Sequence, residues 1–305
     1  MKNMLAAIFL TALIAVGCNP AGKTVRKIIL CGDDKLQIIK VPPRDSTDYQ
    51  VVWEWHSAEG ESTWGPNFTR RLRTLDDCKV VSDGKQVLVT SSGGGVFLLD
   101  IASRKPLFYT EAPNAHSADI LPGGRILVAL SSHPEGSSLE LYDIQQPGKC
   151  LWRDSLTAAH GAVWMKEKER LYALGSILSP NGNKSVIRAY RLKDWDSPHP
   201  SLEETDRWSD LPSGGHDLTR INAGELIFSG SRGVYVIDAT DGKIRPFEPL
   251  HNTRAIKSVN YIEKSKQLVY TKGEIRWWTH HVYSENPAWK LNVDSIHVYK
   301  VRIFE

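Results

Sequence analysis

Short runs of β-favouring residues, separated by turn residues, fill the chain after residue 25. The clearest unit has predicted strands at residues 78–81, 86–90, 96–101 and 106–110, with turns at Asp83-Gly84 and Gly93-Gly94-Gly95. Apolar runs of this length, bounded by Gly and Asp, are typical of strands joined by tight turns. Helical periodicity is nearly absent, so the pattern predicts an all-β protein.

The same unit recurs along the chain. The predicted strands of the next four units are 116–121, 125–130, 139–144 and 150–153; then 160–165, 170–175, 186–192 and a poorly defined strand before residue 208; then 216–221, 225–229, 234–238 and 243–247; then 256–262, 267–271 and 274–279, with an irregular stretch through residue 287. Four-stranded units at this spacing are typical of propeller blades.

The two ends of the chain complete one more unit. A predicted strand at residues 296–304 lies at the C-terminus, and predicted strands at 27–31, 36–41 and 50–55 lie near the N-terminus. Joining the last strand to these three closes the ring, and closure removes exposed sheet edges. We therefore predict a six-bladed β-propeller that occupies residues 27–305 as a single domain.

The first residues predict a lipoprotein signal peptide. Lys2 precedes an apolar run at residues 4–16, which is too short for a membrane span, and the run ends in Ile14-Ala15-Val16-Gly17-Cys18. This resembles a bacterial lipobox, so we expect a signal peptide at 1–17, lipidation of Cys18 and a tether at 18–26. The expected location is the cell envelope, on the periplasmic face or the outer-membrane surface. An ordinary secretory signal and an uncleaved anchor are the alternatives.

Composition excludes several classes of partner and site. The formal net charge of +3 is too small, without a basic stripe, to predict nucleic-acid binding. Besides Cys18 the chain has Cys31, Cys78 and Cys150, an odd number without a zinc-site spacing. They are interpreted as buried thiols, with a Cys31–Cys78 bridge as the alternative. A monomer is expected.

An ionisable residue stands where each repeat begins. The six residues are Lys79, His116, His160, His216, Lys257 and Lys300, with Lys79 at a shorter offset from the next strand. Repeats superimpose equivalent positions around an axis, so these side chains are predicted to line a central channel. Ionisable groups avoid burial without partners, which indicates a polar site there.

The sequences around these positions resemble a known family. The matching elements are Asn114-Ala115-His116-Ser117-Ala118, His160-Gly161-Ala162-Val163-Trp164, Gly214-Gly215-His216-Asp217-Leu218, Lys257-Ser258-Val259, Trp277-Trp278-Thr279 and Tyr299-Lys300-Val301-Arg302. Over residues 27–305 the chain resembles domain of unknown function 6528, found in bacterial envelope lipoproteins. The resemblance implies a propeller at the envelope and brings no established reaction.

The three histidines are the predicted catalytic groups. His116, His160 and His216 are predicted either to hold Mn²⁺, Zn²⁺ or Ca²⁺, with Asp217 or Asn114 orienting an imidazole, or to act as a metal-free base. Neighbouring lysines disfavour the cationic imidazole and leave a neutral base near pH 7. Tyr299 is a candidate acid.

The other predicted site residues are assigned to substrate binding. Lys257, Lys300 and Arg302 suit a carboxylate or sulfate. The remaining candidates are Lys79, Asn114, Trp164, Trp277 and Trp278. Trp64 and these three tryptophans stack on sugar rings in one interpretation and pack between blades in the other. Trp64 lies in a long segment between Trp55 and Cys78, a length typical of functional lids.

Together these groups favour an acidic sugar as substrate. A cation neutralises the carboxylate of a uronate, a histidine removes the neighbouring proton, and the glycosidic oxygen leaves by β-elimination. Some propeller polysaccharide lyases work in this way, which is an analogy at the level of the fold. We therefore predict a carbohydrate-active protein that cleaves acidic oligosaccharides.

Several alternatives stay open. The sequence has no nucleophile elbow, zinc-protease motif or phosphate loop. A glycoside hydrolase needs a facing carboxylate pair, and only Asp77, Asp119 and Asp217 lie near the marked strands. A non-catalytic glycan- or partner-binding lipoprotein using the same channel mouth is the main alternative. A scaffold whose partners dock on the blade faces is another, and a purely structural channel whose polar residues bind only water is a third.

Overall fold

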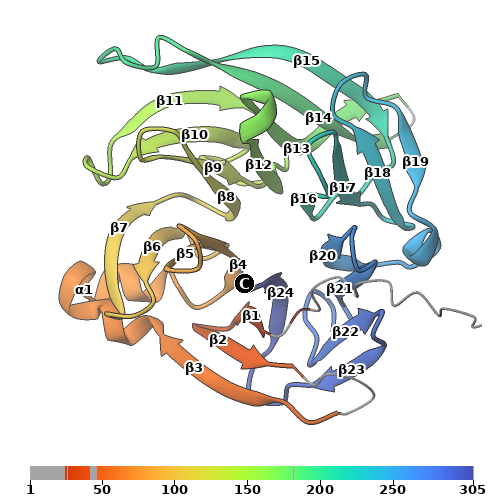
Figure 1. The fold of residues 1–305 in the computed structure, drawn as a ribbon. Coiled ribbons are helices and arrows are strands. Elements are labelled where there is room, and N and C mark those ends of the chain that lie inside the picture. The colour runs from red at the N-terminus through yellow and green to blue at the C-terminus, as the bar shows by residue number, and fades with distance from the viewer. Residues whose placement is uncertain (1–24, 26, 42–46, 181, 305) are drawn as a thin grey trace, which may run out of the picture.

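The computed structural model describes residues 25, 27–41, 47–180 and 182–304. Six four-stranded antiparallel sheets surround one axis (Figure 1), which confirms the six-bladed β-propeller. The predicted signal peptide, Cys18 and most of the predicted tether lie outside the described residues. Within the described ranges, no helix is both long enough and apolar enough to cross a membrane.

The closing blade combines both ends of the chain, as predicted. Its inner strand is β24 (Val298–Ile303), followed outward by β1 (Lys27–Gly32), β2 (Lys35–Lys40) and β3 (Gln50–His56). The C-terminal strand pairs with β1 in the register Ile29↔Arg302 and Leu30↔Val301. Backbone hydrogen bonds between the two chain ends therefore close the ring.

The other five blades each run from an inner strand to an outer strand. They comprise β4 (Leu75–Val81), β5 (Gln86–Ser91), β6 (Gly95–Asp100) and β7 (Lys105–Glu111); β8 (Ala115–Leu121), β9 (Arg125–Leu130), β10 (Ser138–Asp143) and β11 (Cys150–Ser155); β12 (Gly161–Met165), β13 (Arg170–Ser179), β14 (Gly182–Lys193) and β15 (Ser201–Leu211); β16 (Leu218–Arg220), β17 (Glu225–Ser229), β18 (Val234–Asp238) and β19 (Ile244–Pro246); and β20 (Ile256–Ile262), β21 (Gln267–Lys272), β22 (His281–Glu285) and β23 (Trp289–Asn292).

One predicted strand is wrong. Residues 274–279 form a tight turn between β21 and β22, closed by the bridge Ile275↔Trp278, and the third strand of that blade begins at His281. The aromatic residues in this stretch favour a strand, but Arg276 has a positive φ of 60° that no strand accommodates. The error matters because this turn carries Trp277 and Trp278.

The long segment after β3 is part of the core, and its interpretation as a lid is wrong. It forms a 3₁₀ turn, η1 (Ser57–Gly60), and a short helix, α1 (Glu61–Arg70). Trp64 is only 8% exposed, and its ring lies 6.0 Å from Trp55 and 5.3 Å from Phe97. Trp64 therefore packs between the closing blade and the next one, which removes it from the candidates for sugar stacking.

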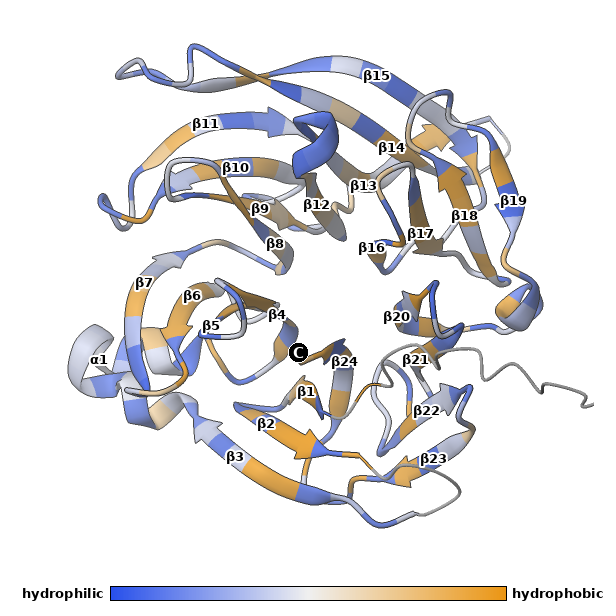
Figure 2. Ribbon diagram, viewed as in Figure 1, coloured by the Kyte–Doolittle hydropathy of each residue, from blue (hydrophilic) through white to orange (hydrophobic). Residues whose placement is uncertain are grey.

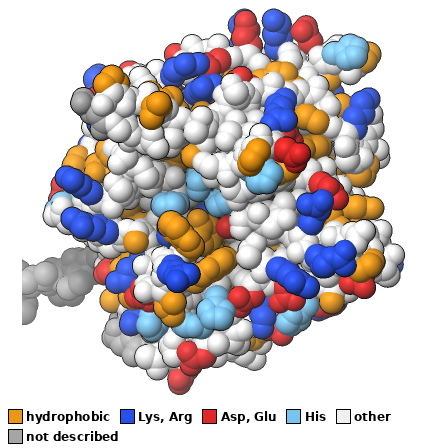
Figure 3. Space-filling model, turned by 180° about the vertical axis from the view of Figure 1, so that it is seen from behind, with side chains coloured by type: hydrophobic (Ala, Val, Ile, Leu, Met, Phe, Trp, Pro, Cys, Tyr) orange, Lys and Arg blue, Asp and Glu red, His pale blue; other side chains and the backbone are white. Residues whose placement is uncertain are grey.

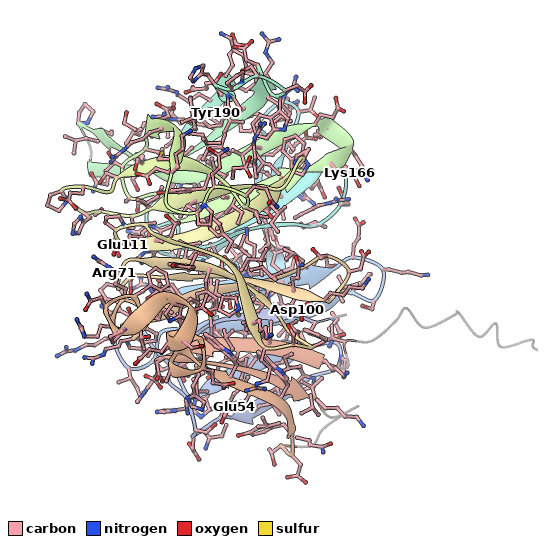
Figure 4. All side chains as sticks on the ribbon, turned by 90° about the vertical axis from the view of Figure 1, so that its left-hand side faces the viewer. Glu54, Arg71, Asp100, Glu111, Lys166 and Tyr190 are labelled. Carbon is pink, nitrogen blue, oxygen red and sulfur yellow. The ribbon has the colours of Figure 1, made fainter. Side chains whose placement is uncertain are left out.

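A salt bridge fastens the end of this segment to the next blade. Arg71 follows α1, and its Nη2 lies 2.8 Å from Glu111 Oε2 at the end of β7. Figure 4 shows the two labelled residues side by side, on the opposite side of the molecule from Asp100 and Lys166. The long segment is thus held at both its helix and its end.

Apolar clusters fill the space between neighbouring sheets. One cluster joins Ile29 and Leu36 of the closing blade to Cys78 and Val87 of the next. Figure 2 shows the hydrophobic colour on strands such as β2 and β18, whereas the outer strand β15 is mostly hydrophilic. The apolar side chains are thus buried between the blades. The side chains that line the central axis come from the inner strands, and these form the candidate site.

A prediction concerns the closure. Gly32 lies where β1 meets β24, and a Cβ built there would stand 1.9 Å from the backbone oxygen of His297. Gly32→Ala is therefore expected to lower the free energy of unfolding by about 1–3 kcal/mol, measured by urea titration. Gly224→Ala is the control, because a Cβ there meets only the side chain of Asn222 at 3.6 Å. Equal losses in both variants would contradict a tight closure.

Candidate functional site

An extra residue near the start of the inner strands builds the site. In β8 the register passes from Ala115↔Leu130 to Ser117↔Ala129, which leaves His116 as a β-bulge. The same irregularity leaves Asp76, Lys257 and Tyr299 unpaired in β4, β20 and β24. A bulge redirects a side chain out of the alternating pattern.

The two remaining blades place a histidine at the corresponding point. His160 donates its backbone N–H to Leu174 O at 2.9 Å, although Gly161 is the paired partner of Leu174. His216 and Asp217 both donate backbone N–H groups to Ser229 Oγ, at 3.3 and 3.0 Å. The ring around the axis is therefore Asp76, His116, His160, His216, Lys257 and Tyr299.

This ring differs from the predicted one at two positions. Asp76 replaces Lys79, and Tyr299 replaces its neighbour Lys300. The prediction followed positively charged residues along the inner strands and so missed the carboxyl group. The dipeptides Asp76-Asp77 and His216-Asp217 indicate the correct alignment of the repeats, because each has a ring residue followed by an aspartate.

The ring members lie close to one another. The imidazole centroids of His116 and His160 are 4.4 Å apart, and those of His160 and His216 are 5.2 Å apart. His216 Nε2 lies 3.1 Å from Lys257 Nζ, and His116 Nε2 lies 3.8 Å from Asp76 Oδ1. The predicted convergence of the three histidines is thus present in the structure.

A cavity of about 460 Å³ opens above the ring. Its lining comprises Asp76, Ser92, Asn114, His116, Ser131, Ser132, His160, His216, Trp277, Trp278 and Tyr299. Figure 3 shows this face of the molecule, where His side chains gather near the centre beside a hydrophobic patch. Seven of the residues predicted from the sequence therefore share one cavity.

Backbone carbonyls set the tautomers of two histidines. His116 Nδ1 lies 3.0 Å from Asn114 O, and His160 Nδ1 lies 2.8 Å from Ala158 O. A carbonyl only accepts hydrogen bonds, so the neutral ring carries its proton on Nδ1 and keeps a lone pair on Nε2. Asn114 also donates its side-chain amide to Ser132 O at 2.9 Å, which fixes the loop before β8.

Burial keeps all three histidines neutral. It lowers the pKa of His116 to about 4, and the charges of Lys300 and Lys257 act in the same direction. Burial also holds the pKa of His160 and His216 well below the usual range, with a further contribution from the adjacent imidazole in each case. At pH 7 the ring therefore presents uncharged imidazoles.

Asp76 and Tyr299 are the acidic groups of the ring. Burial raises the pKa of Asp76 to about 7, against the opposing hydrogen bonds from Ser92. Both its protonated and ionised forms are therefore populated at neutral pH. Burial also raises the pKa of Tyr299 well above its usual range, so this phenol keeps its proton.

Lys257 is a buried cation beside the third histidine. Its side chain is 2% exposed, and no carboxylate among the described residues pairs with it. Burial, followed by the charge of Lys300, lowers its pKa to about 8. The ammonium group donates to His216 Nε2, so the proton of that neutral ring lies on Nδ1. His216 Nδ1 is buried and has no hydrogen-bond partner within the described ranges.

An aromatic turn covers this lysine. The ammonium group of Lys257 lies 4.7 Å from the ring centroid of Trp277, which is 59% exposed, and Trp278 packs 5.3 Å from Tyr299. Cations favour the face of an indole. Trp277 therefore screens the lysine on one side and offers an exposed surface at the mouth of the cavity.

Glu274 braces the turn. Its Oε2 accepts hydrogen bonds from Thr279 Oγ1 and His281 Nδ1, both at 2.6 Å, and its Oε1 accepts one from Tyr283. Burial opposes ionisation, but these three hydrogen bonds outweigh it and lower the pKa of Glu274 to about 2. The carboxylate thus holds both tryptophans in place through the base of their turn.

Below the ring, a buried cluster of charges occupies the axis. Arg302 Nε and Nη2 bind Asp77 at 2.7 and 2.9 Å, while its Nη1 and Nη2 bind Asp217 at 2.8 and 2.6 Å. Lys300 Nζ lies 3.1 Å from Asp217 and 3.6 Å from Asp77. The two carboxylates come from β4 and from the loop before β16, which lie three blades apart and therefore on opposite sides of the axis.

We call this group the axial charge cluster. It contains Lys300 and Arg302, the two residues of the C-terminal strand that were predicted to bind a substrate anion. Burial alone would raise the pKa of Asp77, but the charges of Arg302 and Lys300 outweigh it and hold that pKa well below its usual range. Both carboxylates are therefore ionised and pair with the two cations. The structure assigns Lys300 and Arg302 to this internal contact and leaves Lys257 as the cation beside the cavity.

Two further predicted residues lie at the opposite end of the axis. Lys79 Nζ is 3.8 Å from Asp119 Oδ2 and donates to Ala162 O, and Trp164 donates its backbone N–H to Asp119 at 2.8 Å. They line a separate cavity of about 290 Å³, together with Arg302. The structure therefore separates Lys79 and Trp164 from the histidines.

The geometry gives no support to a metal centre. Among the described residues, no group of three or more His, Cys, Asp or Glu side chains is arranged to hold a metal ion. The site brings together neutral imidazoles, a buried ammonium group and a carboxyl group whose pKa burial raises to about 7.

Comparison of the sequence with known protein families finds one family, for which no activity is described. The model of a family described as "Family of unknown function (DUF6528)" matches residues 14–304. A search of curated proteins finds no match to this chain.

The first prediction from the site concerns Asp76. Its folded-state pKa of about 7 exceeds the ordinary value of about 3.9, so the folded chain holds a proton that the unfolded chain releases between these pH values. This contribution to stability is complete below pH 4 and is lost as pH rises to 7.

Asp76→Asn removes this dependence. Relative to the unmodified chain, the variant is expected to gain about 1.4 kcal/mol of stability per pH unit between pH 5 and pH 7, measured by urea titrations at several pH values. Asp83→Asn, at an exposed turn, is the control and should leave the pH dependence unchanged. A flat difference between Asp76→Asn and the unmodified chain would contradict the raised pKa.

The second prediction concerns the axial charge cluster. Arg302→Met leaves Asp77 and Asp217 buried without their guanidinium partner. We expect the free energy of unfolding to fall by about 3–5 kcal/mol, measured by chemical denaturation followed by circular dichroism. Arg232→Met, an exposed position, is the control and should change it by less than about 0.5 kcal/mol.

Proposed function

The chain belongs to the DUF6528 family, and because that family is described as one of unknown function, we propose an activity from the site itself: lyase-type β-elimination on acidic, uronate-type oligosaccharides. One observation carries the proposal. Three adjacent neutral imidazoles line a cavity beside a lysine that has no carboxylate partner among the described residues. A general base and an anion site thus occur together.

Substrate binding is proposed to use the mouth of the cavity. A cavity of about 460 Å³ falls within the range for small-molecule sites, and the exposed indole of Trp277 offers a stacking surface for a sugar ring. The uronate carboxylate would lie beside the ring of His216, which lines the cavity. Lys257, 3.1 Å from Nε2 of that ring, would supply the positive charge.

The proposed reaction has one proton acceptor and one proton donor. Neutralising the carboxylate acidifies the C5–H bond of the uronate, and His160 Nε2 accepts that proton. The electron pair forms the C4=C5 double bond while the C4–O bond breaks. The leaving oxygen takes a proton from the protonated carboxyl of Asp76 or from the phenol of Tyr299, both of which line the cavity.

A non-catalytic glycan-binding protein is the second candidate. The observation that favours it is the low pKa of the buried histidines, about 4 at His116 and well below the usual range at the proposed base His160, because an imidazole of such low pKa is a weak base. The same cavity and indole would then bind an acidic glycan without cleaving it. In either case we propose a location at the bacterial cell envelope, with attachment through Cys18.

A panel of acidic oligosaccharides tests both candidates. Oligogalacturonides, alginate fragments and glycosaminoglycan fragments are incubated with the purified chain. Product is followed by the ultraviolet absorbance of the unsaturated uronate, and binding by calorimetry. Loss of the base in His160→Ala is expected to lower the rate by at least about 100-fold, and Lys257→Met is expected to abolish binding as well.

Lys79→Met is the matched control. It removes a lysine at the other end of the axis and should leave the rate and the affinity unchanged. Binding with no product at any pH would select the second candidate. A panel that shows neither binding nor product would overturn the proposal as a whole.

A further inference from the structure

Two cysteines that the proposed reaction does not use face each other across the seam of the closing blade. Cys31 lies in β1, one strand of the pair that closes the ring, and Cys78 lies in β4, the inner strand of the following blade. Figure 1 shows β1 and β4 side by side near the axis. Both cysteines are fully buried in the apolar cluster shared by these two blades.

Burial raises the pKa of the Cys78 thiol well above its usual value, and the neighbouring Cys31 thiol acts in the same direction. Cys78 Sγ also lies 3.8 Å from the carbonyl oxygen of Ile29, two residues before Cys31 on the same strand, which brings the side chain of Cys78 onto β1. Cys31 Sγ lies 3.6 Å from Lys300 O of the paired strand β24. Apart from each other and these backbone oxygens, neither thiol has a polar contact in the described part of the chain.

The third described cysteine offers no competing pair. Cys150 is exposed at the start of β11, in the blade after that of Cys78, and its Sγ contacts Trp152 O at 3.2 Å. The fold thus brings together two of its three described cysteines and leaves one at the surface.

We propose that Cys31 and Cys78 form a disulfide when the chain folds in an oxidising compartment, and that this bond links the closing blade covalently to its neighbour. The oxidant is a disulfide of the glutathione or thiol-oxidoreductase class. One thiolate attacks that disulfide and forms a mixed disulfide, and the second thiolate then displaces the reduced oxidant. Two protons leave the cysteines, and the two electrons reduce the oxidant to thiols.

Burial determines when the bond forms. The reacting species is the thiolate, and burial raises the pKa of the Cys78 thiol well above its usual value. The disulfide of the oxidant also cannot reach the two sulfur atoms once they are fully buried. The bond therefore forms while the blades assemble, before β1 and β4 close over both side chains.

The disulfide is expected to stabilise the fold mainly by restricting the unfolded chain. A disulfide restricts the unfolded ensemble more strongly when it closes a longer loop. This one encloses α1 and the outer strands of the closing blade, because they lie between the two cysteines. It also ties the N-terminal strand to the ring by a covalent link in addition to its hydrogen bonds with β24.

Refolding of the full chain tests the proposal. The reduced, denatured protein is refolded in parallel with oxidised and reduced glutathione or with reduced glutathione alone. It is then denatured, alkylated without reductant, digested and analysed by mass spectrometry. We expect a linked peptide pair containing Cys31 and Cys78 only in the first sample, while alkylation of native protein should label Cys150 in both.

The thermal midpoint supplies a second readout. The oxidised sample should unfold several degrees higher than the reduced one, and Cys31→Ser should remove this difference. Cys150→Ser is the matched control and should retain it. Full alkylation of Cys31 and Cys78 after oxidative refolding, or a linked peptide that contains Cys150, would overturn the proposal. None of these outcomes bears on the proposed sugar chemistry.

Discussion

The salt bridges of Arg302 are the interaction on which the centre of this molecule depends. Six inner strands bring polar side chains to one axis, where water is largely excluded and an unpaired charge is costly. Asp77 and Asp217 approach from opposite blades, and the guanidinium group of the last strand binds both. The strand that closes the ring by backbone hydrogen bonds thus also carries the cation that joins opposite blades. Lys300 from the same strand completes the cluster.

This pairing determines what remains for chemistry. The two predicted cations of β24 are engaged with carboxylates, so among the described residues Lys257 is the lysine that remains beside the cavity. Its buried charge and that of Lys300 help to keep the histidines neutral. The aromatic turn held by Glu274 then covers the lysine. The ion pairs below the ring engage Lys300 and Arg302, and the aromatic turn above it screens Lys257. The site that results has neutral imidazoles beside the Lys257 cation.

Much of this arrangement follows from local sequence patterns. Turn residues and β-favouring runs predicted the number of blades and the strand that closes the ring, because each blade repeats the same local chemistry. The errors arose where geometry departs from that repeat. A one-residue bulge places Tyr299 rather than Lys300 in the ring, and Gly65 and Pro66 kink α1 so that no helical periodicity is visible. The pairing of Arg302 with Asp77 and Asp217 joins residues that are distant in sequence, and no local pattern contains it.

The axial charge cluster also closes the histidine cavity at its inner end. It lies between the histidine cavity and the cavity that holds Lys79, so nothing as large as a sugar passes from one to the other. A long polymer cannot thread through this propeller. A polymeric ligand of the proposed kind would have to present a free end, or a short branch, and then withdraw through the mouth by which it entered. Under the proposed function, this closed channel therefore predicts recognition of chain ends rather than of positions within a chain.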